Sequence, residues 1–306
     1  MNVLTTMLQL FFAMAIGFVM RKKGVIDHNS NKMLSFIVVN ISAPILAVTS
    51  VANADGDKSA VLKFMAVGFI FYLCLPLLGE LVAKVLRAPE SDKAVYELSV
   101  VFGNNVFMGF PVVTAIFGPS AIFYSYIFNI MFNFMYYSYG INLITRGSDT
   151  LAGQTKLESL KKCINNGTIA ALISLIMFFF DLQLPVFAND VLNFIGNLAT
   201  PLSMIAIGSS MASFPFSRML ENKKILAIIP IRLIMMPILA YIVMTLTGFD
   251  GMLRGIITVT FGMPVASMVS MGCTEYECHE EEASTAVVAS TVISIITIPI
   301  LMIMFS

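Results

Sequence analysis

The sequence predicts an all-α integral membrane protein with ten transmembrane helices, arranged as two inverted five-helix repeats in which helices four and nine are broken. Three observations predict this fold: the composition, the number of long apolar runs, and motifs shared by the two halves. Of the 306 residues, 58% are hydrophobic and 12% are charged, and the mean hydropathy is +0.88. Soluble globular proteins carry about 25% charged residues. We therefore expect most of the chain to lie in lipid.

The charge balance and the cysteines exclude several other classes of protein. Lys and Arg total 18 and so do Asp and Glu, which is not the balance of a nucleic-acid-binding protein. The four cysteines have irregular spacing and form no disulfide framework. No basic residue precedes Arg21, so the first apolar segment lacks the basic start of a cleaved signal peptide. We expect it to be retained as a span.

The apolar runs set the number of spans, because a bilayer core needs about 20 mostly apolar residues per helix. The ten runs lie near 4–20, 33–52, 61–83, 94–116, 120–144, 165–181, 187–211, 224–247, 252–271 and 283–305. The longest polar connection, 145–164, separates a first five-helix repeat (1–144) from a second one (165–306).

The loop charges predict the orientation, because cytoplasmic loops retain Lys and Arg. One set of alternate loops carries 14 of these residues, including those of the 145–164 linker, whereas the other set carries Lys58, Lys63 and Arg254. This bias places the linker in the cytoplasm and both termini outside it. We expect a multi-pass protein of the plasma membrane, in a bacterium the inner membrane.

The two halves share motifs in corresponding spans. Asn-x-x-x-Pro occurs at 40–44 and 197–201, an offset of 157, and Gly-x-Pro-Val occurs at 109–112 and 262–265, an offset of 153. Because each half has an odd number of spans, the second half must be inserted upside down relative to the first. Inverted repeats of this kind are typical of secondary transporters.

Glycine and proline in spans four and nine predict broken helices near mid-membrane. Irregular backbone at that depth must be buried in protein or line a wet cavity. Pro111 and Pro264 would begin the second half-helices, whose N-terminal ends suit an anion. Two ordinary kinked helices are the alternative. The residues that we expect to bind substrate are Asn104, Asn105, Gly109, Pro111, Gly262, Pro264, Ser267, Asn129, Asn133 and Arg232.

Three members of this set have alternative roles. Arg232 lies inside a span, where it could contact a carboxylate substrate, extend to the cytoplasmic surface or pair with a glutamate. Asn129 and Asn133 share a helix face, which could bond a neighbouring helix or line the path. Four further residues have a structural interpretation, as braces of helix kinks: Asn40, Pro44, Asn197 and Pro201.

Two stretches of sequence resemble a known family. The run Asn-Asn-x-Phe-x-Gly-Phe-Pro at 104–111, together with the tail 283–288 that leads to Ser290 and Pro299, resembles the auxin efflux carrier family, which includes bacterial malate and malonate permeases. The resemblance covers the whole chain. In the plant members an asparagine pair flanks a proline in helix four, whereas here Asn104 and Asn105 are adjacent, and the long plant cytoplasmic loop is missing.

The resemblance implies that the broken helices four and nine cross each other. It also implies a scaffold built from helices 1, 2, 6 and 7 and a transport domain built from helices 3–5 and 8–10. It also implies elevator-like movement of an organic anion, and homodimers. We therefore expect a secondary transporter, either a permease or an efflux carrier, for a small mono- or dicarboxylate such as malate or malonate. A channel or sensor is the alternative, and an intramembrane enzyme is less favoured because no Gly-x-Ser-x-Gly run is present.

The sequence predicts no cofactor and no metal site. The segment 275–282 lacks the spacing of zinc ligands and is interpreted as a solvated acidic loop. No phosphate-binding glycine loop with lysine is present, so ATP is not expected to drive transport. Coupling to H⁺ or to Na⁺ stays open. The expected partners are the organic anion and the lipid bilayer, and no nucleic acid.

Overall fold

The computed structural model describes residues 3–53, 57–145, 163–213, 223–249, 251–276 and 279–305. Within these ranges the regular elements are helical, and the one β-type pairing is an isolated bridge between Gly103 and Val265. Most of the 145–164 linker lies outside the described residues, as does part of the 275–282 loop.

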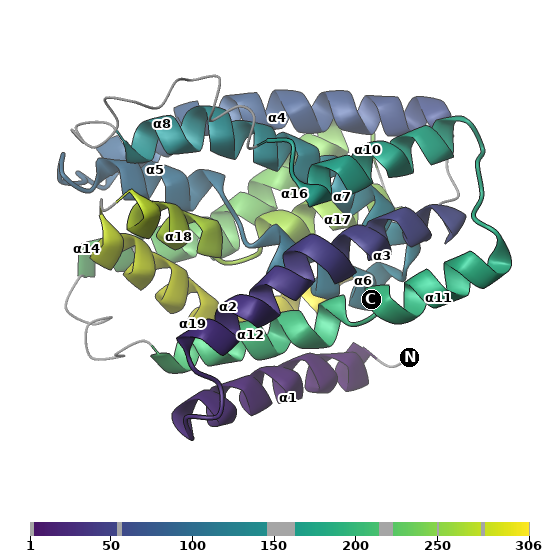
Figure 1. The fold of residues 1–306 in the computed structure, drawn as a ribbon. Helices are drawn as coiled ribbons and strands as arrows, with labels where there is room; N and C mark the ends of the chain where they lie inside the picture. Colours follow the sequence, from purple (N-terminus) through teal and green to yellow (C-terminus); the bar gives the residue numbers. More distant parts are fainter. Residues whose placement is uncertain are drawn as a thin grey trace.

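The first half of the chain comprises α1 (Val3–Lys22), α2 (His28–Ile37), η1 (Val38–Ser42), α3 (Ala43–Ser50), η2 (Val51–Asn53), α4 (Lys58–Val85), α5 (Lys93–Val101), η3 (Asn105–Gly109), α6 (Phe110–Phe117), α7 (Ser120–Met135), η4 (Tyr136–Gly140) and α8 (Ile141–Ile144). The second half comprises α10 (Asn166–Phe179), α11 (Val186–Gly196), α12 (Ala199–Ser213), α14 (Lys223–Leu226), α15 (Ile228–Pro230), η6 (Ile231–Met235), α16 (Met236–Leu246), α17 (Gly251–Phe261), α18 (Ser267–Glu275) and α19 (Glu280–Phe305). Figure 1 shows these helices in place.

Several of the helices are long and apolar enough to cross a membrane. Five such stretches are His28–Ser50, Lys58–Val85, Val186–Ser213, Ile228–Leu246 and Glu280–Leu301, and three shorter apolar helices are Asn105–Phe117, Asn166–Phe179 and Gly251–Phe261. Side chains such as Phe12, Leu77 and Phe187 are large, apolar and exposed on the outside of the bundle. The structure is that of a multi-pass helical membrane protein.

Polar side chains define where several of these helices begin. The Asp27 carboxylate accepts the backbone N–H of Ser30 at the start of α2, at 2.7 Å. Asn165 accepts the N–H of Thr168 at the start of α10, at 3.0 Å. Each bond satisfies a donor that the first turn of a helix would otherwise leave unpaired. The aqueous ends of these helices are therefore encoded locally.

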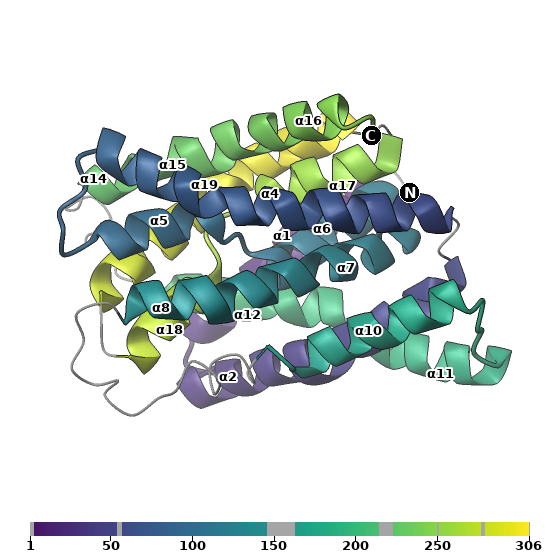
Figure 2. The ribbon, with the colours of Figure 1, turned by 90° about the horizontal axis from the view of Figure 1, so that it is seen from above.

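The extensive contacts between helices fall into two groups, and α7 takes part in both. In one group α1 packs on α12, α12 on α2, and α3 on α10 and α11, whereas in the other α4 packs on α5 and α7, and α16 on α17. Figure 2 shows α2, α10 and α11 together on one side of the molecule, with α4, α16 and α19 on the other. The groups meet where α7 contacts α3 and α10, and where α1 and α12 approach η3 and α6.

Candidate functional site

Two helices are interrupted inside the molecule, where the sequence predicts breaks. The first interruption separates α5 from η3 and α6, and the second separates α17 from α18. The two interruptions bind each other: the Asn104 N–H donates to the Pro264 carbonyl at 2.8 Å, and the Ala266 N–H donates to the Phe102 carbonyl at 3.0 Å. The alternative of two continuous, kinked helices is therefore wrong.

The other backbone groups of the second interruption also find partners. The Val265 N–H donates to the Ser290 hydroxyl of α19 at 3.0 Å, and the Gly262 N–H donates to the Thr258 carbonyl at 3.0 Å. Irregular backbone in a membrane is stable only when its polar groups are satisfied in this way. The interruptions are consequently built features of the fold rather than frayed helix ends.

The two prolines differ in position from each other. Pro111 lies in the first turn of α6, as the sequence predicts, after the π-helical turn η3 that contains Gly109. Pro264 does not begin α18, because α18 begins three residues later at Ser267. The expectation for Pro264 is corrected: it lies in the extended segment after Gly262, where its carbonyl is the acceptor that joins the two interruptions.

Asn104 and Asn105 are both buried at this crossing and make long, weak side-chain hydrogen bonds. The Asn104 Nδ2 is 3.4 Å from the Ser267 hydroxyl, and the Asn105 Nδ2 is 3.4 Å from the hydroxyl of Tyr72 on α4. The Asn105 Oδ1 is buried and has no hydrogen-bond partner among the described residues. An unpaired buried amide oxygen is uncommon in proteins. The crossing therefore retains hydrogen-bonding capacity that the protein itself does not use.

Arg232 is the charged side chain at the crossing. It is 1% exposed, and it donates from Nε to the Met263 carbonyl and from Nη1 to the Val100 carbonyl, each at 2.9 Å. The two alternatives that place it elsewhere are wrong: the guanidinium does not extend to the surface. Among the described residues the ion pairs are Lys58–Asp181 and Lys84–Glu80, and neither includes Arg232.

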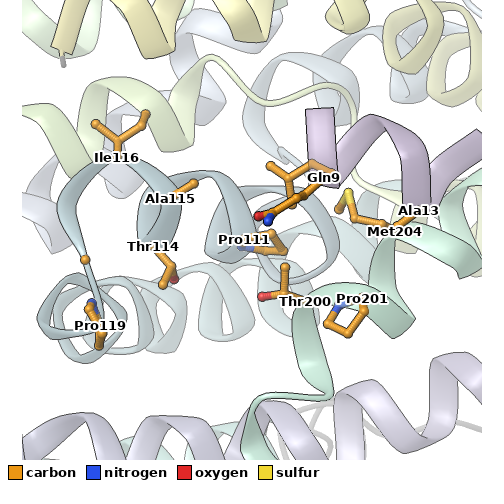
Figure 3. Close-up of a pocket in the computed structure, with 12 residues that line it drawn as sticks. Gln9, Ala13, Pro111, Thr114, Ala115, Ile116, Pro119, Thr200, Pro201 and Met204 are labelled. Atoms are coloured by element: carbon orange, nitrogen blue, oxygen red, sulfur yellow. The ribbon is translucent and has the colours of Figure 1, made fainter. Parts of the chain in front are cut away.

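A pocket of about 650 Å³ lies between α1, α6 and α12. Figure 3 shows Pro111 of α6 and Pro201 of α12 on its wall, together with the polar residues Gln9, Thr114 and Thr200. The Thr114 hydroxyl donates to the Phe110 carbonyl at 2.7 Å, so it braces the start of α6. The pocket therefore connects the second half of the first interrupted helix with the other helix group.

Asn129 and Asn133 lie on α7 and are both buried. The Asn133 Nδ2 donates to the Thr168 hydroxyl of α10 at 3.1 Å, so this side chain bonds a neighbouring helix. The Asn129 Oδ1 is buried without a hydrogen-bond partner in the described part of the chain. The two asparagines thus differ: one is used in packing between the groups, and the other has an open acceptor.

The predicted braces lie at helix irregularities. Asn40 is inside the π-helical turn η1, before Pro44 in the first turn of α3, and the Asn166 Nδ2 is 3.2 Å from its Oδ1. Asn197 caps the C-terminal end of α11, and Pro201 lies in the first turn of α12. Both motifs therefore mark the place where one helix segment passes into the next.

Sequence reasoning missed Tyr72 and the polar pocket residues Gln9, Thr114 and Thr200. Each is a single polar group in an apolar run, which is a weak signal by itself. Polar side chains in a membrane helix face the bundle interior as a rule, and that signal could have marked Tyr72 and Gln9.

Two interrupted helices that cross inside a multi-pass helical bundle are typical of membrane transport proteins. Residues 2–302 match the family model described as membrane transport protein, and the chain belongs to this family, the auxin efflux carrier family that its motifs resemble. The chain is 22% identical over 299 residues to an uncharacterized transporter of Methanothermobacter thermautotrophicus, covering 96% of each chain. It is 22% identical over 297 residues to an uncharacterized transporter of Methanocaldococcus jannaschii, covering 92% of each.

Proposed function

We propose that this protein is a secondary transporter of a small organic anion, a mono- or dicarboxylate such as malate or malonate, in the plasma membrane. The observation that carries the proposal is the crossing of the two interruptions. There the Asn105 amide oxygen has no hydrogen-bond partner among the described residues, and the buried Arg232 bonds the Val100 and Met263 carbonyls. A carrier needs such a site, which a solute can enter and leave.

The charge of the crossing favours an anion. Among the described residues no carboxylate lies within ion-pair distance of Arg232, so its positive charge is not compensated by a neighbouring acidic side chain. The N-terminal end of α18 begins at Ser267, next to Asn104, and N-terminal helix ends carry partial positive charge. Both contributions attract a carboxylate. Asn104, Asn105 and Ser267 would orient it by hydrogen bonds.

The two helix groups support an elevator-type mechanism with alternating access. Under this proposal α1–α3 and α10–α12 form the scaffold, and the group that contains both interruptions moves against it. The motif offsets of 157 and 153 residues support a ten-span inverted repeat in which the two groups each combine elements of both halves.

The pocket is lined by α6, the half-helix that follows the first interruption, and under this proposal it is the outer part of the route to the crossing. Figures 1 and 2 place both chain ends at the same end of the helices. The pocket includes Gln9, near the start of α1, and Pro119, in the connection between α6 and α7. In the orientation that the loop charges predict, it opens to the non-cytoplasmic side. The structure would then represent the state that faces outward.

The test is uptake of radiolabelled malonate and malate by purified protein in liposomes. The expected result is saturable uptake with counterflow, reduced at least tenfold by Asn105→Ala or Pro264→Ala while the folded yield is unchanged. Asn142→Ala is the matched control, because Asn142 is exposed on α8. Repeating the assay with and without Na⁺ and across pH identifies a coupling ion. Unitary current steps would favour a channel, and normal transport of both acids by both variants would contradict the proposed site.

A further inference from the structure

The Arg232 guanidinium touches both interruptions at once. Its Nε donates to the Met263 carbonyl in the second interruption, and its Nη1 donates to the Val100 carbonyl at the end of α5, each at 2.9 Å. Its charged carbon also lies 5.7 Å from the centre of the Phe261 ring, at the last residue of α17. A single side chain thus contacts the C-terminal ends of both first half-helices.

The bond to Val100 satisfies a carbonyl in the last turn of α5, whereas the Met263 carbonyl lies in the segment that follows the end of α17. The last carbonyls of a helix have no partner within the helix and carry partial negative charge, which a cation stabilises. The planar guanidinium presents several N–H donors in fixed directions, so it can bond two carbonyls from different segments at the same time. With these bonds made, the Nε and Nη1 atoms of Arg232 each hold a backbone carbonyl of one of the two interruptions.

Gly103 shows how closely the guanidinium fits. A Cβ atom added at Gly103 would overlap the Arg232 Nη2, and the next nearest atom, Arg232 Cζ, would be 2.8 Å away. Gly103 also makes the antiparallel bridge to Val265. Gly103 lies between α5 and η3, and the Arg232 guanidinium occupies the space that a side chain at this position would fill.

We propose that Arg232 is a positioning residue: it fastens the two interruptions together and so sets the geometry of the polar site around Asn104 and Asn105, without contacting the solute. The proposal rests on the proposed function for its effect on transport, whereas its structural part stands without it. The positive charge of Arg232 attracts the anion from a distance, whereas its hydrogen bonds hold the two interruptions in place.

The structural part is tested by a double-mutant cycle on the thermal unfolding of the purified protein in detergent. Gly103→Ala is expected to lower Tm on the order of 5 °C, because the new methyl group displaces the guanidinium. In the Arg232→Met background the same change is expected to have no further effect, because the overlapping atoms are gone. Gly109→Ala is the matched glycine control, since its Cβ would lie at an ordinary 3.5 Å from Met263. Equal effects of Gly103→Ala in both backgrounds would overturn the proposal.

The functional part is tested by malonate uptake, with KM and maximal rate measured separately. A displaced crossing is expected to raise KM at least tenfold in Gly103→Ala, although that variant keeps the arginine and its charge. The KM of Arg232→Lys is expected to resemble that of Arg232→Met, because a lysine ammonium group does not reproduce the planar guanidinium that bonds two carbonyls at once. Wild-type KM in Gly103→Ala, or full rescue by Arg232→Lys, would show instead that only the positive charge matters. If the wild-type chain transports no carboxylate, the proposed function fails and the Tm cycle still decides the role of Arg232.

Discussion

At the scale of single residues, glycine decides how closely the helices approach. A Cβ at Gly208 of α12 would overlap the backbone carbonyl of Met14, and one at Gly17 of α1 would overlap the carbonyl of Ile205. The two glycines therefore allow α1 and α12 to pack backbone against backbone. In lipid, where apolar surfaces gain little by meeting each other, such close packing is a main source of helix association.

Gly208→Ala is accordingly expected to destabilise the protein by about 1–3 kcal/mol, the usual cost of overpacking a close contact. The measurement is Tm in detergent. Ser213→Ala on the same helix is the control, because Ser213 is exposed and its hydroxyl donates to the Ser209 carbonyl within α12. A Tm for Gly208→Ala equal to that of the control would show that the close packing of α1 on α12 does not contribute to stability.

At the scale of the element, the start of α2 is stabilised by a charged capping residue, Asp27. The pKa of Asp27 is held below its ordinary value of 3.8, first because its carboxylate accepts the Ser30 N–H and then because it accepts the Ser30 hydroxyl. A lowered folded-state pKa stabilises the folded protein above the unfolded-state value, and this stabilisation disappears as the pH falls through the folded-state value.

The pH dependence can be isolated with Asp27→Asn, which keeps a capping oxygen and removes the titration. The wild-type protein is expected to exceed this variant in Tm at neutral pH, and the difference is expected to shrink below about pH 4. Thermal unfolding across pH measures it, with Asp190→Asn inside α11 as a control. A difference that does not change with pH would contradict this role of the carboxylate.

Elements also differ in how far the sequence predicts them. The breaks in the fourth and ninth spans are predictable because Gly, Pro and Asn disfavour a continuous helix over a few adjacent residues. The residue at which the helix starts again is harder to predict. The helix α18 begins at Ser267 rather than at Pro264, because the Pro264 carbonyl bonds the N–H of Asn104, which is distant in sequence. The partners of Arg232 are backbone carbonyls, and these leave no trace in the residue types.

At the scale of the whole molecule, an ion pair links the two helix groups. Lys58 at the start of α4 lies 2.6 Å from Asp181, which follows α10, and both side chains are substantially exposed. An exposed pair of this kind adds little stability. If the two groups move against each other, as the proposed mechanism requires, we expect Lys58 and Asp181 to separate.

We therefore expect a short bis-maleimide cross-link between Lys58→Cys and Asp181→Cys, in a chain without the native cysteines, to abolish malonate transport. The cross-linker should have no effect on either single variant. Uptake in liposomes before and after cross-linking is the measurement. Undiminished uptake by fully cross-linked protein would rule out a mechanism in which α4 and α10 move apart.

The bridge between Gly103 and Val265 has a mechanical consequence. The hydrogen bonds that flank it, from the Asn104 N–H to the Pro264 carbonyl and from the Ala266 N–H to the Phe102 carbonyl, hold the two interrupted helices together. If one interrupted helix slid without the other, backbone N–H and C=O groups inside the membrane would lose their hydrogen bonds, at a high cost in free energy. Displacing one interrupted helix would have to break these hydrogen bonds or carry the other helix along, so we expect the two helices to move together.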